Sequence, residues 1–172
     1  DPWDNQFWLK LGNFAQGAKY EFTARVRADH SAKASTQIHN APGSYVDWNA
    51  IGDIQFTSEW TDVKVSGTFA AAGQSIAFNL SEDTNANTYY FANMSFKVGG
   101  TERLTNGNLE GTDMSAFVQK VDQGAVVTCE TQSGFQYVQL PQPIPLSAQE
   151  RHDTLVYAMD KWIKGMMTAC KG

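Results

Sequence analysis

Residues 35–52, STQIHNAPGSYVDWNAIG, combine hydrogen-bonding side chains with flat aromatic rings. Gln37 and His39 can donate and accept hydrogen bonds, and Tyr45 and Trp48 offer wide apolar faces. A sugar chain needs both, because its C–H faces stack on aromatic rings while its hydroxyls bond to planar polar groups. The segment therefore predicts one wall of a glycan-binding cleft, the alternative being an ordinary surface loop.

The strand period indicates which further residues could join this wall. In an extended chain Gln37 and His39 share one face, and the Pro42-Gly43 turn then delivers Tyr45 and Trp48. More distant parts of the chain add further candidates. Asn79 lies on the polar face of the predicted strand SIAFNLSE, and Gln6 lies on the strand face that it shares with Trp8. Trp3 either caps the fold or lines the cleft. We expect Trp48 and Tyr45 to stack on sugars, and Gln37, His39, Asn79 and Gln6 to bind hydroxyls.

The composition limits the class of protein. The chain has 172 residues, of which 42% are hydrophobic and 18% charged, as in a globular domain with a core. The formal net charge of −5 argues against nucleic acid as a partner. No apolar run is long enough to span a membrane. The abrupt start at Asp1-Pro2-Trp3 suggests that a leader segment has been excised.

Period-two alternation dominates residues 1–100. In AKYEFTARVRA the apolar residues Tyr20, Phe22, Ala24 and Val26 alternate with polar ones, and TDVKVSGTF, SIAFNLSE and TYYFANMSFKV repeat the pattern. Turn-forming clusters separate these runs. The sequence therefore predicts an all-β fold, a sandwich of two antiparallel sheets.

The pattern changes along the last third of the chain. Residues 101–139 indicate more strands and turns, with a tight-turn signal at Asn106-Gly107. Three prolines make residues 140–146 an extended linker. Ser147 and Glu150 then form a capping box, and apolar residues recur at helical spacing through residues 147–172. We expect one C-terminal α-helix belonging to a different domain.

That helix resembles a known enzyme family. ERHDTLVYAMDKWIKGMMTACKG is similar to the third helix of the family 10 glycoside hydrolases, the xylanase (β/α)8 barrel. The resemblance covers about the last 25 residues and implies a fragment of a parent endo-1,4-β-xylanase. The chain ends before the strand that carries the acid/base glutamate, so neither catalytic glutamate is present.

The first 100 residues resemble the family 4 and family 22 type of carbohydrate-binding module. They are more similar still to the modules that Bacteroidetes insert inside family 10 xylanases. The residues that carry the resemblance are PWDNQFW, AKASTQIHNAPGSYVDWNAIGDIQFTSEW and SIAFNLSEDTNANTYYFANMSF. It implies a jelly-roll-like sandwich, xylan or xylo-oligosaccharides as ligand, and an extracellular, cell-surface or periplasmic location in a Gram-negative bacterium. It also places Trp60 in the scaffold, where we expect core packing.

Two features depart from that family. NGNLEG at 106–111 resembles the first strand of such modules but follows the last strand here, so residues 106–139 either complete the sandwich, which we favour, or begin a second module. A structural calcium ion is a further expectation near Glu110, although Ala92 and Asn93 stand where the family has an aspartate. We expect no other cofactor.

We therefore interpret residues 1–139 as a non-catalytic module that binds internal xylan chains and holds the parent catalytic domain on its substrate. A module for another β-glycan such as mixed-linkage glucan, or a spacer that binds no sugar, remain open alternatives. Independent catalysis is not expected, because no pair of carboxylates can be placed together. Cys129 and Cys170 are interpreted as unpaired thiols, although sequence alone does not establish their pairing.

Overall fold

Strands account for almost all of the regular structure in the computed structural model, which describes residues 1–41, 43–82, 86–121, 155–157, 159 and 161. The chain divides into two units, residues 1–134 and 135–172, which are described separately. The strands of the first unit are β1 (Asn5–Phe14), β2 (Lys19–Ala28), β3 (Ala32–Ala34), β4 (Thr36–His39), β5 (Tyr45–Asp47), β6 (Ile54–Phe56), β7 (Thr61–Thr68), β8 (Gly73–Asn79), β9 (Tyr89–Val98), β10 (Thr101–Glu102) and β11 (Phe117–Val121).

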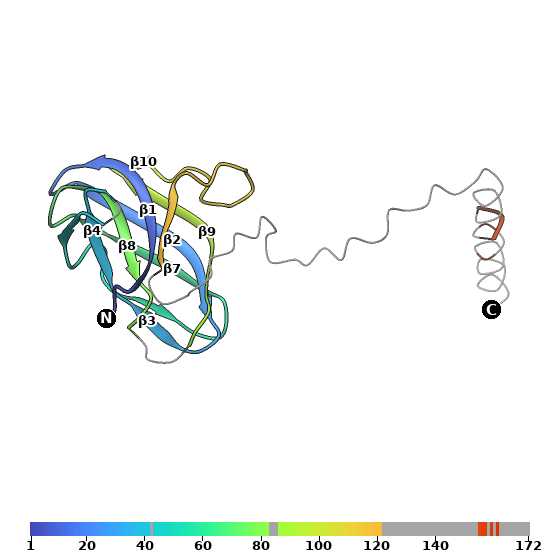
Figure 1. Cartoon of the computed structure of the whole chain (residues 1–172). Coiled ribbons are helices and arrows are strands. Elements are labelled where there is room, and N and C mark those ends of the chain that lie inside the picture. The colour runs from blue at the N-terminus through green and yellow to red at the C-terminus, as the bar shows by residue number, and fades with distance from the viewer. Residues whose placement is uncertain (42, 83–85, 122–154, 158, 160, 162–172) are drawn as a thin grey trace. The chain divides into compact units, whose positions relative to one another are not determined.

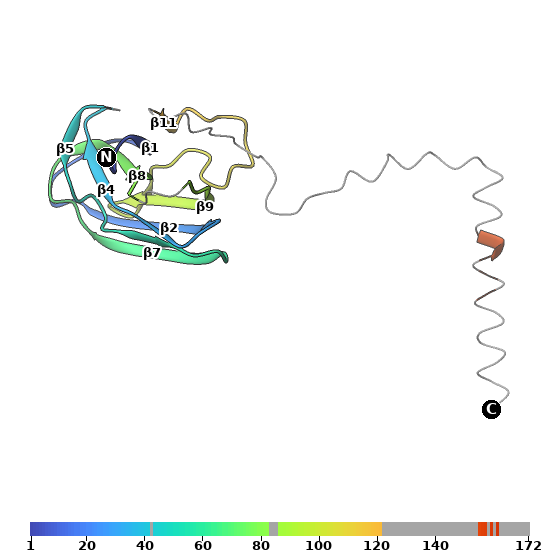
Figure 2. The same ribbon diagram turned by 60° about the horizontal axis from the view of Figure 1, so that its bottom comes forward.

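Two antiparallel sheets form the sandwich. One has the order β11-β1-β8-β4-β5 and the other the order β10-β9-β2-β7, while β3 and β6 make a short separate ladder (Figure 1). Figure 2 shows the sheets as two layers, with β4, β5 and β8 in one and β2 and β7 in the other. The prediction of an all-β sandwich is confirmed.

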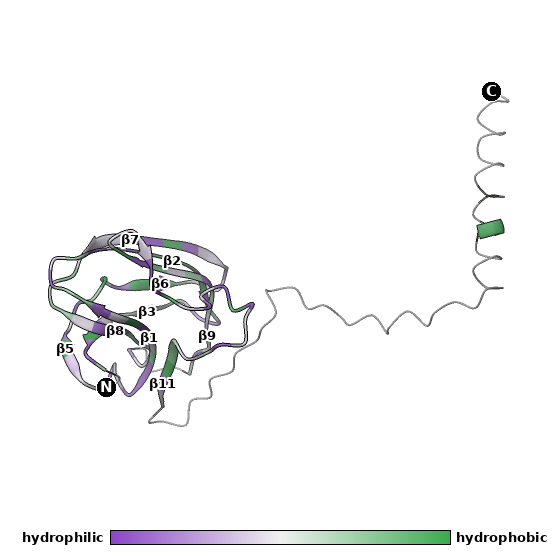
Figure 3. Cartoon of the chain, turned by 90° about the horizontal axis from the view of Figure 1, so that it is seen from above, coloured by the Kyte–Doolittle hydropathy of each residue, from purple (hydrophilic) through white to green (hydrophobic). Residues whose placement is uncertain are grey.

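The core lies between the layers and follows the period of two. On β2, Phe22, Ala24 and Val26 are buried, and the intervening polar residues face outward, so the strands change hydropathy from residue to residue (Figure 3). Phe78 of β8 meets Phe22 of the facing sheet with ring centroids 5.7 Å apart. These aromatic contacts across the two sheets make one continuous core.

The segment after β9 returns to the first sheet. β11 pairs antiparallel with β1, from Asn5 opposite Val121 to Leu9 opposite Phe117. Residues 106–111, which resemble a first strand in sequence, form turns instead: Asn106 and Leu109 have positive φ values of 57° and 60°, and the Asn106 side chain bonds to the backbone of Gly111. A left-handed backbone interrupts a strand, so local turn chemistry overrides the strand pattern here. Residues 122–139, the rest of this segment, lie outside the described residues.

The expected core position of Trp60 is wrong. Its side chain is 37% exposed and lies on the outer surface, where the guanidinium carbons of Arg25 and Arg27 are 5.8 and 5.7 Å from its ring centroid. Arg27 also lies 3.9 Å from the ring centroid of Tyr90. Both arginines occupy outward positions of β2, so the indole packs on their side chains rather than between the sheets.

In the second unit the described residues 155–157, 159 and 161 are helical, as the spacing predicts. Leu155, Tyr157 and Met159 are exposed. The linker at 140–146, the capping box and both cysteines lie outside the described residues. Within the part of the chain that the structure describes, no helix has the length and hydropathy needed to cross a membrane.

Candidate functional site

A cleft of about 380 Å³ opens on the outer face of the sheet that contains β1, β8 and β4. It is lined by Trp3, Gln6, Gln37, His39, Gly43, Tyr45 and Trp48. The structure thus brings together every residue predicted for the site except Asn79. The volume falls in the range of small-ligand sites, roughly 300–1,000 Å³.

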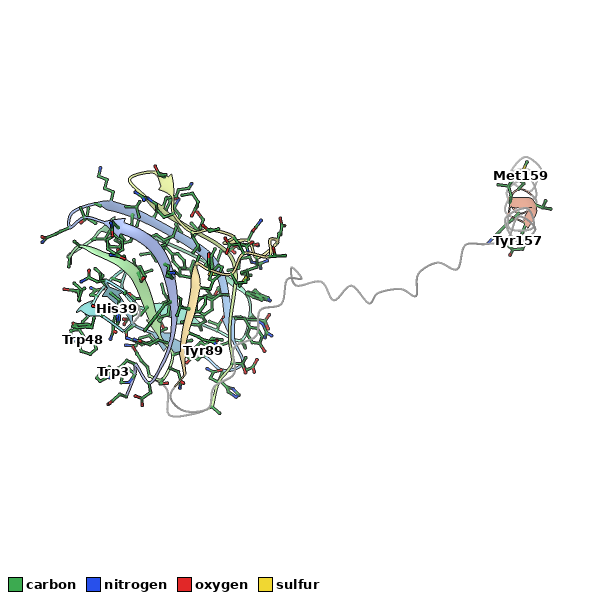
Figure 4. All side chains as sticks on the ribbon, turned by 45° about the horizontal axis from the view of Figure 1, so that its top comes forward. Trp3, His39, Trp48, Tyr89, Tyr157 and Met159 are labelled. Atoms are coloured by element: carbon green, nitrogen blue, oxygen red, sulfur yellow. The ribbon has the colours of Figure 1, made fainter. Side chains whose placement is uncertain are left out.

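Three aromatic rings form one wall of this cleft. Trp48 lies between Trp3 and Tyr45, with ring centroids 5.1 Å from each and interplanar angles of 58° and 54°. The Trp48 side chain is 57% exposed and that of Tyr45 is 45% exposed. Trp3 and Trp48 lie on the same side of the domain as His39 (Figure 4). Exposed indole and phenol rings held by their neighbours give a preformed surface for an apolar ligand face.

The polar floor comes from alternate residues of two strands that flank β8. Across the sheet, Trp8 of β1 and Gln37 of β4 both pair with Ala77, and His39 pairs with Ser75. These β8 residues have small side chains that are buried between the two flanking strands. Thr36 and Ile38 point into the core, as the period of two predicts.

Hydrogen bonds connect the floor into one network. Gln6 Nε2 donates to Gln37 Oε1 at 3.0 Å and to Asn79 Oδ1 at 2.7 Å. His39 Nε2 lies 3.0 Å from the same Gln37 oxygen, and the Trp8 indole N–H donates to Gln6 Oε1 at 3.0 Å. Buried polar groups that are mutually bonded hold one geometry, so the floor is preorganised.

Asn79 lies outside the cleft lining. Its side chain is fully buried, with its oxygen bonded to Gln6 and its Nδ2 donating to Ser35 Oγ at 3.0 Å. The residue lies at the end of β8 opposite Gln6, beneath the floor rather than in the lining. Asn79 therefore supports the Gln6 amide in this structure, and its predicted bond to a sugar hydroxyl stays a prediction.

Sequence reasoning missed two residues of the site. Gly43 lines the cleft with φ of +85°, a conformation that favours glycine, and a Cβ there would lie 4.0 Å from the Trp8 ring. Trp8 is 4% exposed beneath the cleft, and its ring centroid lies 5.3 Å from that of His39. The face that Trp8 shares with Gln6 in the sequence was the signal that could have identified it.

His39 is buried in its neutral form. The side chain is 4% exposed, its Nδ1 has no hydrogen-bond partner among the described residues, and burial lowers the pKa of the imidazole. Tyr45, whose ring lies edge-on to His39 with centroids 6.0 Å apart, has a raised phenol pKa, first from partial burial and then from the Asp47 carboxylate. At neutral pH the floor and wall are therefore uncharged at these two positions.

The lowered pKa of His39 predicts a pH dependence of stability. In the unfolded chain a histidine binds a proton below about pH 6.5, whereas the folded state resists protonation until lower pH. We expect the free energy of unfolding to fall as pH drops below about 6.5, by at most about 1.4 kcal/mol per pH unit from this group. Urea unfolding of the wild type and a His39→Phe variant between pH 7.5 and 5 measures it, and parallel curves for the two proteins would contradict the assignment.

Glu110, the expected calcium ligand, lies on the surface. Its Oε2 accepts a hydrogen bond from Asn108 Nδ2 at 2.9 Å. Among the described residues, no group of three or more His, Cys, Asp or Glu side chains gathers in a way that could hold a metal ion. A calcium ion near Glu110 therefore stays a prediction.

Comparison with known proteins gives one informative likeness. No protein-family model matches the chain, and no curated protein matches it. A solved structure described as the PbXyn10C CBM in its apo form superposes with a TM-score of 0.59 and 16% sequence identity, covering 69% of this chain and 72% of that chain. The two chains share a fold. At this identity the likeness concerns the β-sandwich alone.

Proposed function

We propose that residues 1–139 are a carbohydrate-binding module that holds internal stretches of a xylan chain in the cleft. The observation that carries the proposal is the joining of an exposed aromatic wall, Trp3, Trp48 and Tyr45, to a floor of amide and imidazole groups in one cleft. The shared fold with the PbXyn10C CBM supports it. Sugar chains offer the matching pair of surfaces, C–H faces and hydroxyl edges.

The tilt of the aromatic rings favours xylan among β-1,4 glycans. Successive rings are turned by 58° and 54° rather than lying in one plane. A xylan chain twists strongly from one sugar to the next, whereas a cellulose chain is a flat ribbon that suits coplanar rings. The cleft also differs from the flat apolar surface with which a module binds crystalline cellulose, because the polar residues Gln6, Gln37 and His39 form its floor.

We infer a binding role rather than hydrolysis from the chemistry of the lining. Glycoside hydrolases use two carboxyl groups placed on either side of the scissile bond. None of the described residues that line the cleft carries a carboxylate. The module would instead raise the effective concentration of substrate near a linked catalytic domain.

The wider setting of the proposal rests on the sequence resemblance. The C-terminal residues 147–172 resemble a helix of a family 10 xylanase barrel, so the proposed partner is the catalytic domain of a parent endo-1,4-β-xylanase. The proposed location is outside the cell, at the cell surface or in the periplasm of a Gram-negative bacterium, of the Bacteroidetes type, where polysaccharide is degraded.

Calorimetric titration of the chain with xylohexaose, cellohexaose and a mixed-linkage glucan oligosaccharide tests this function. Binding of xylohexaose alone is the expected result. If the glucose-based chains bind equally well, the proposed ligand becomes β-glycans in general rather than xylan. If only the mixed-linkage chain binds strongly, mixed-linkage glucan becomes the proposed ligand. Absence of binding to all three would overturn the proposal in favour of a structural spacer.

A further inference from the structure

In the hydrogen-bond network under the cleft, the buried indole of Trp8 fixes which groups donate and which accept. The indole N–H of Trp8 can only donate, and it meets Gln6 Oε1 at 3.0 Å. The Gln6 amide therefore presents its oxygen to Trp8 and its NH₂ group to the opposite side. A flipped Gln6 would place its NH₂ group against the indole N–H, two donors facing each other.

The orientation of Gln6 sets that of its two neighbours. Both hydrogens of Gln6 Nε2 are used, at 3.0 Å to Gln37 and 2.7 Å to Asn79, and both partners must present an oxygen there. The Asn79 NH₂ group is then directed to Ser35 Oγ at 3.0 Å. A single N–H group thus decides how three side-chain amides are turned.

The same logic assigns the tautomer of His39. Gln37 Oε1 carries no proton, so the bond of 3.0 Å to His39 Nε2 requires the imidazole to donate from Nε2. Nδ1 is then the unprotonated nitrogen, and it meets no hydrogen-bond partner of either kind among the described residues. In this tautomer His39 is the second donor to the Gln37 oxygen.

One donor group of the network remains for a ligand. The Gln37 oxygen is engaged by Gln6 and His39, while its Nε2 makes no hydrogen bond within the part of the chain that the structure describes. Gln37 lines the cleft, so this NH₂ group is the part of its amide left to meet a bound molecule. The floor therefore offers a donor, never an acceptor, at this position.

The geometry points to Trp8 as a positioning residue for specificity: through Gln6 it turns the Gln37 amide so that its NH₂ group donates to an acceptor oxygen of the bound glycan. This inference rests on the proposed glycan binding. The ring and glycosidic oxygens of a sugar chain only accept hydrogen bonds, so they suit a fixed donor. Without the indole N–H, Gln6 and Gln37 can flip together, with the His39 proton moving from Nε2 to Nδ1, and Gln37 then presents an oxygen to them.

A double-mutant cycle on the whole chain tests the inference. Trp8→Phe keeps a ring against His39 but removes the N–H group, and we expect it to weaken xylohexaose binding about tenfold. Gln37→Glu keeps the inner acceptor for Gln6 and His39 but has no NH₂ group to turn. In the Gln37→Glu background, Trp8→Phe is therefore expected to change the affinity no further.

The outcomes separate this inference from the proposed function. If the wild type binds xylohexaose and Trp8→Phe leaves the affinity unchanged, the role of Trp8 is overturned while glycan binding stands. The same holds if Trp8→Phe weakens binding equally in the wild-type and Gln37→Glu backgrounds. Absence of wild-type binding overturns both. Nitrogen-15 NMR of the wild type without ligand supplies a second readout: a proton on His39 Nε2 is expected, and a proton on Nδ1 would overturn the direction of the network even if the Trp8 variant does not fold.

Discussion

Replacement of Trp48 by alanine is expected to weaken xylohexaose binding by at least about thirtyfold, or about 2 kcal/mol, the scale of a binding hot spot. Trp48 is the central ring of the aromatic wall and has 57% of its side chain exposed, so it offers area to a ligand rather than to the core. Its removal should therefore change the free energy of unfolding little, within about 0.5 kcal/mol. Titration calorimetry and urea unfolding of the same variant measure the two effects.

Trp60 supplies a matched control for this experiment. It is another tryptophan with an exposed side chain, but it packs on Arg25 and Arg27 on the outer face of the other sheet. Trp60→Ala is expected to keep the wild-type Kd. An unchanged Kd for Trp48→Ala, or an equal loss for Trp60→Ala, would show that the cleft is not the binding site.

The largest expected loss of stability comes from Phe78→Ala, at about 3–5 kcal/mol. Phe78 is fully buried at the centre of the core, and its ring centroid lies 5.7 Å from that of Phe22 in the facing sheet and 5.3 Å from that of Phe91. Truncation removes apolar contacts from both layers and leaves a cavity that neighbouring strands cannot fill. Urea unfolding followed by tryptophan fluorescence measures the loss.

Phe78→Leu is the control, because leucine retains most of the apolar volume and should cost much less. A loss below about 1 kcal/mol for Phe78→Ala would mean that this ring does not join the two sheets as described. Since a typical domain is stable by about 5–15 kcal/mol, the alanine variant is expected to lose a large part of its stability, and its unfolding midpoint in urea should fall well below that of the wild type.

The two experiments distinguish the module from a spacer. A spacer needs the core but has no use for an exposed aromatic wall, so it would show the Phe78 effect without the Trp48 effect. A binding module shows both, and the variants separate affinity from stability because the two residues lie on opposite faces of the cleft-bearing sheet.

The local features of this protein could be predicted from short stretches of its sequence. The period of two predicted the strands and their inward residues, because burial of one sheet face repeats every second position. It also placed Gln37 and His39 on one face, and the mixture of amides with aromatic rings predicted a glycan-binding cleft there. These features depend on residues that are close in sequence, so a short segment is enough to predict them.

The order of the strands in the sheets could not be predicted from the sequence and is known only from the folded structure. β1 pairs with β8, so Gln6 meets Asn79 across 73 positions of sequence, and the Asn79 side chain is buried with its oxygen bonded to Gln6. Trp60 lies outside because the outward arginines of β2 are beside it, and NGNLEG forms turns although it resembles a strand. Strand order and the direction of hydrogen bonds between distant amides come from long-range packing, which no local period encodes.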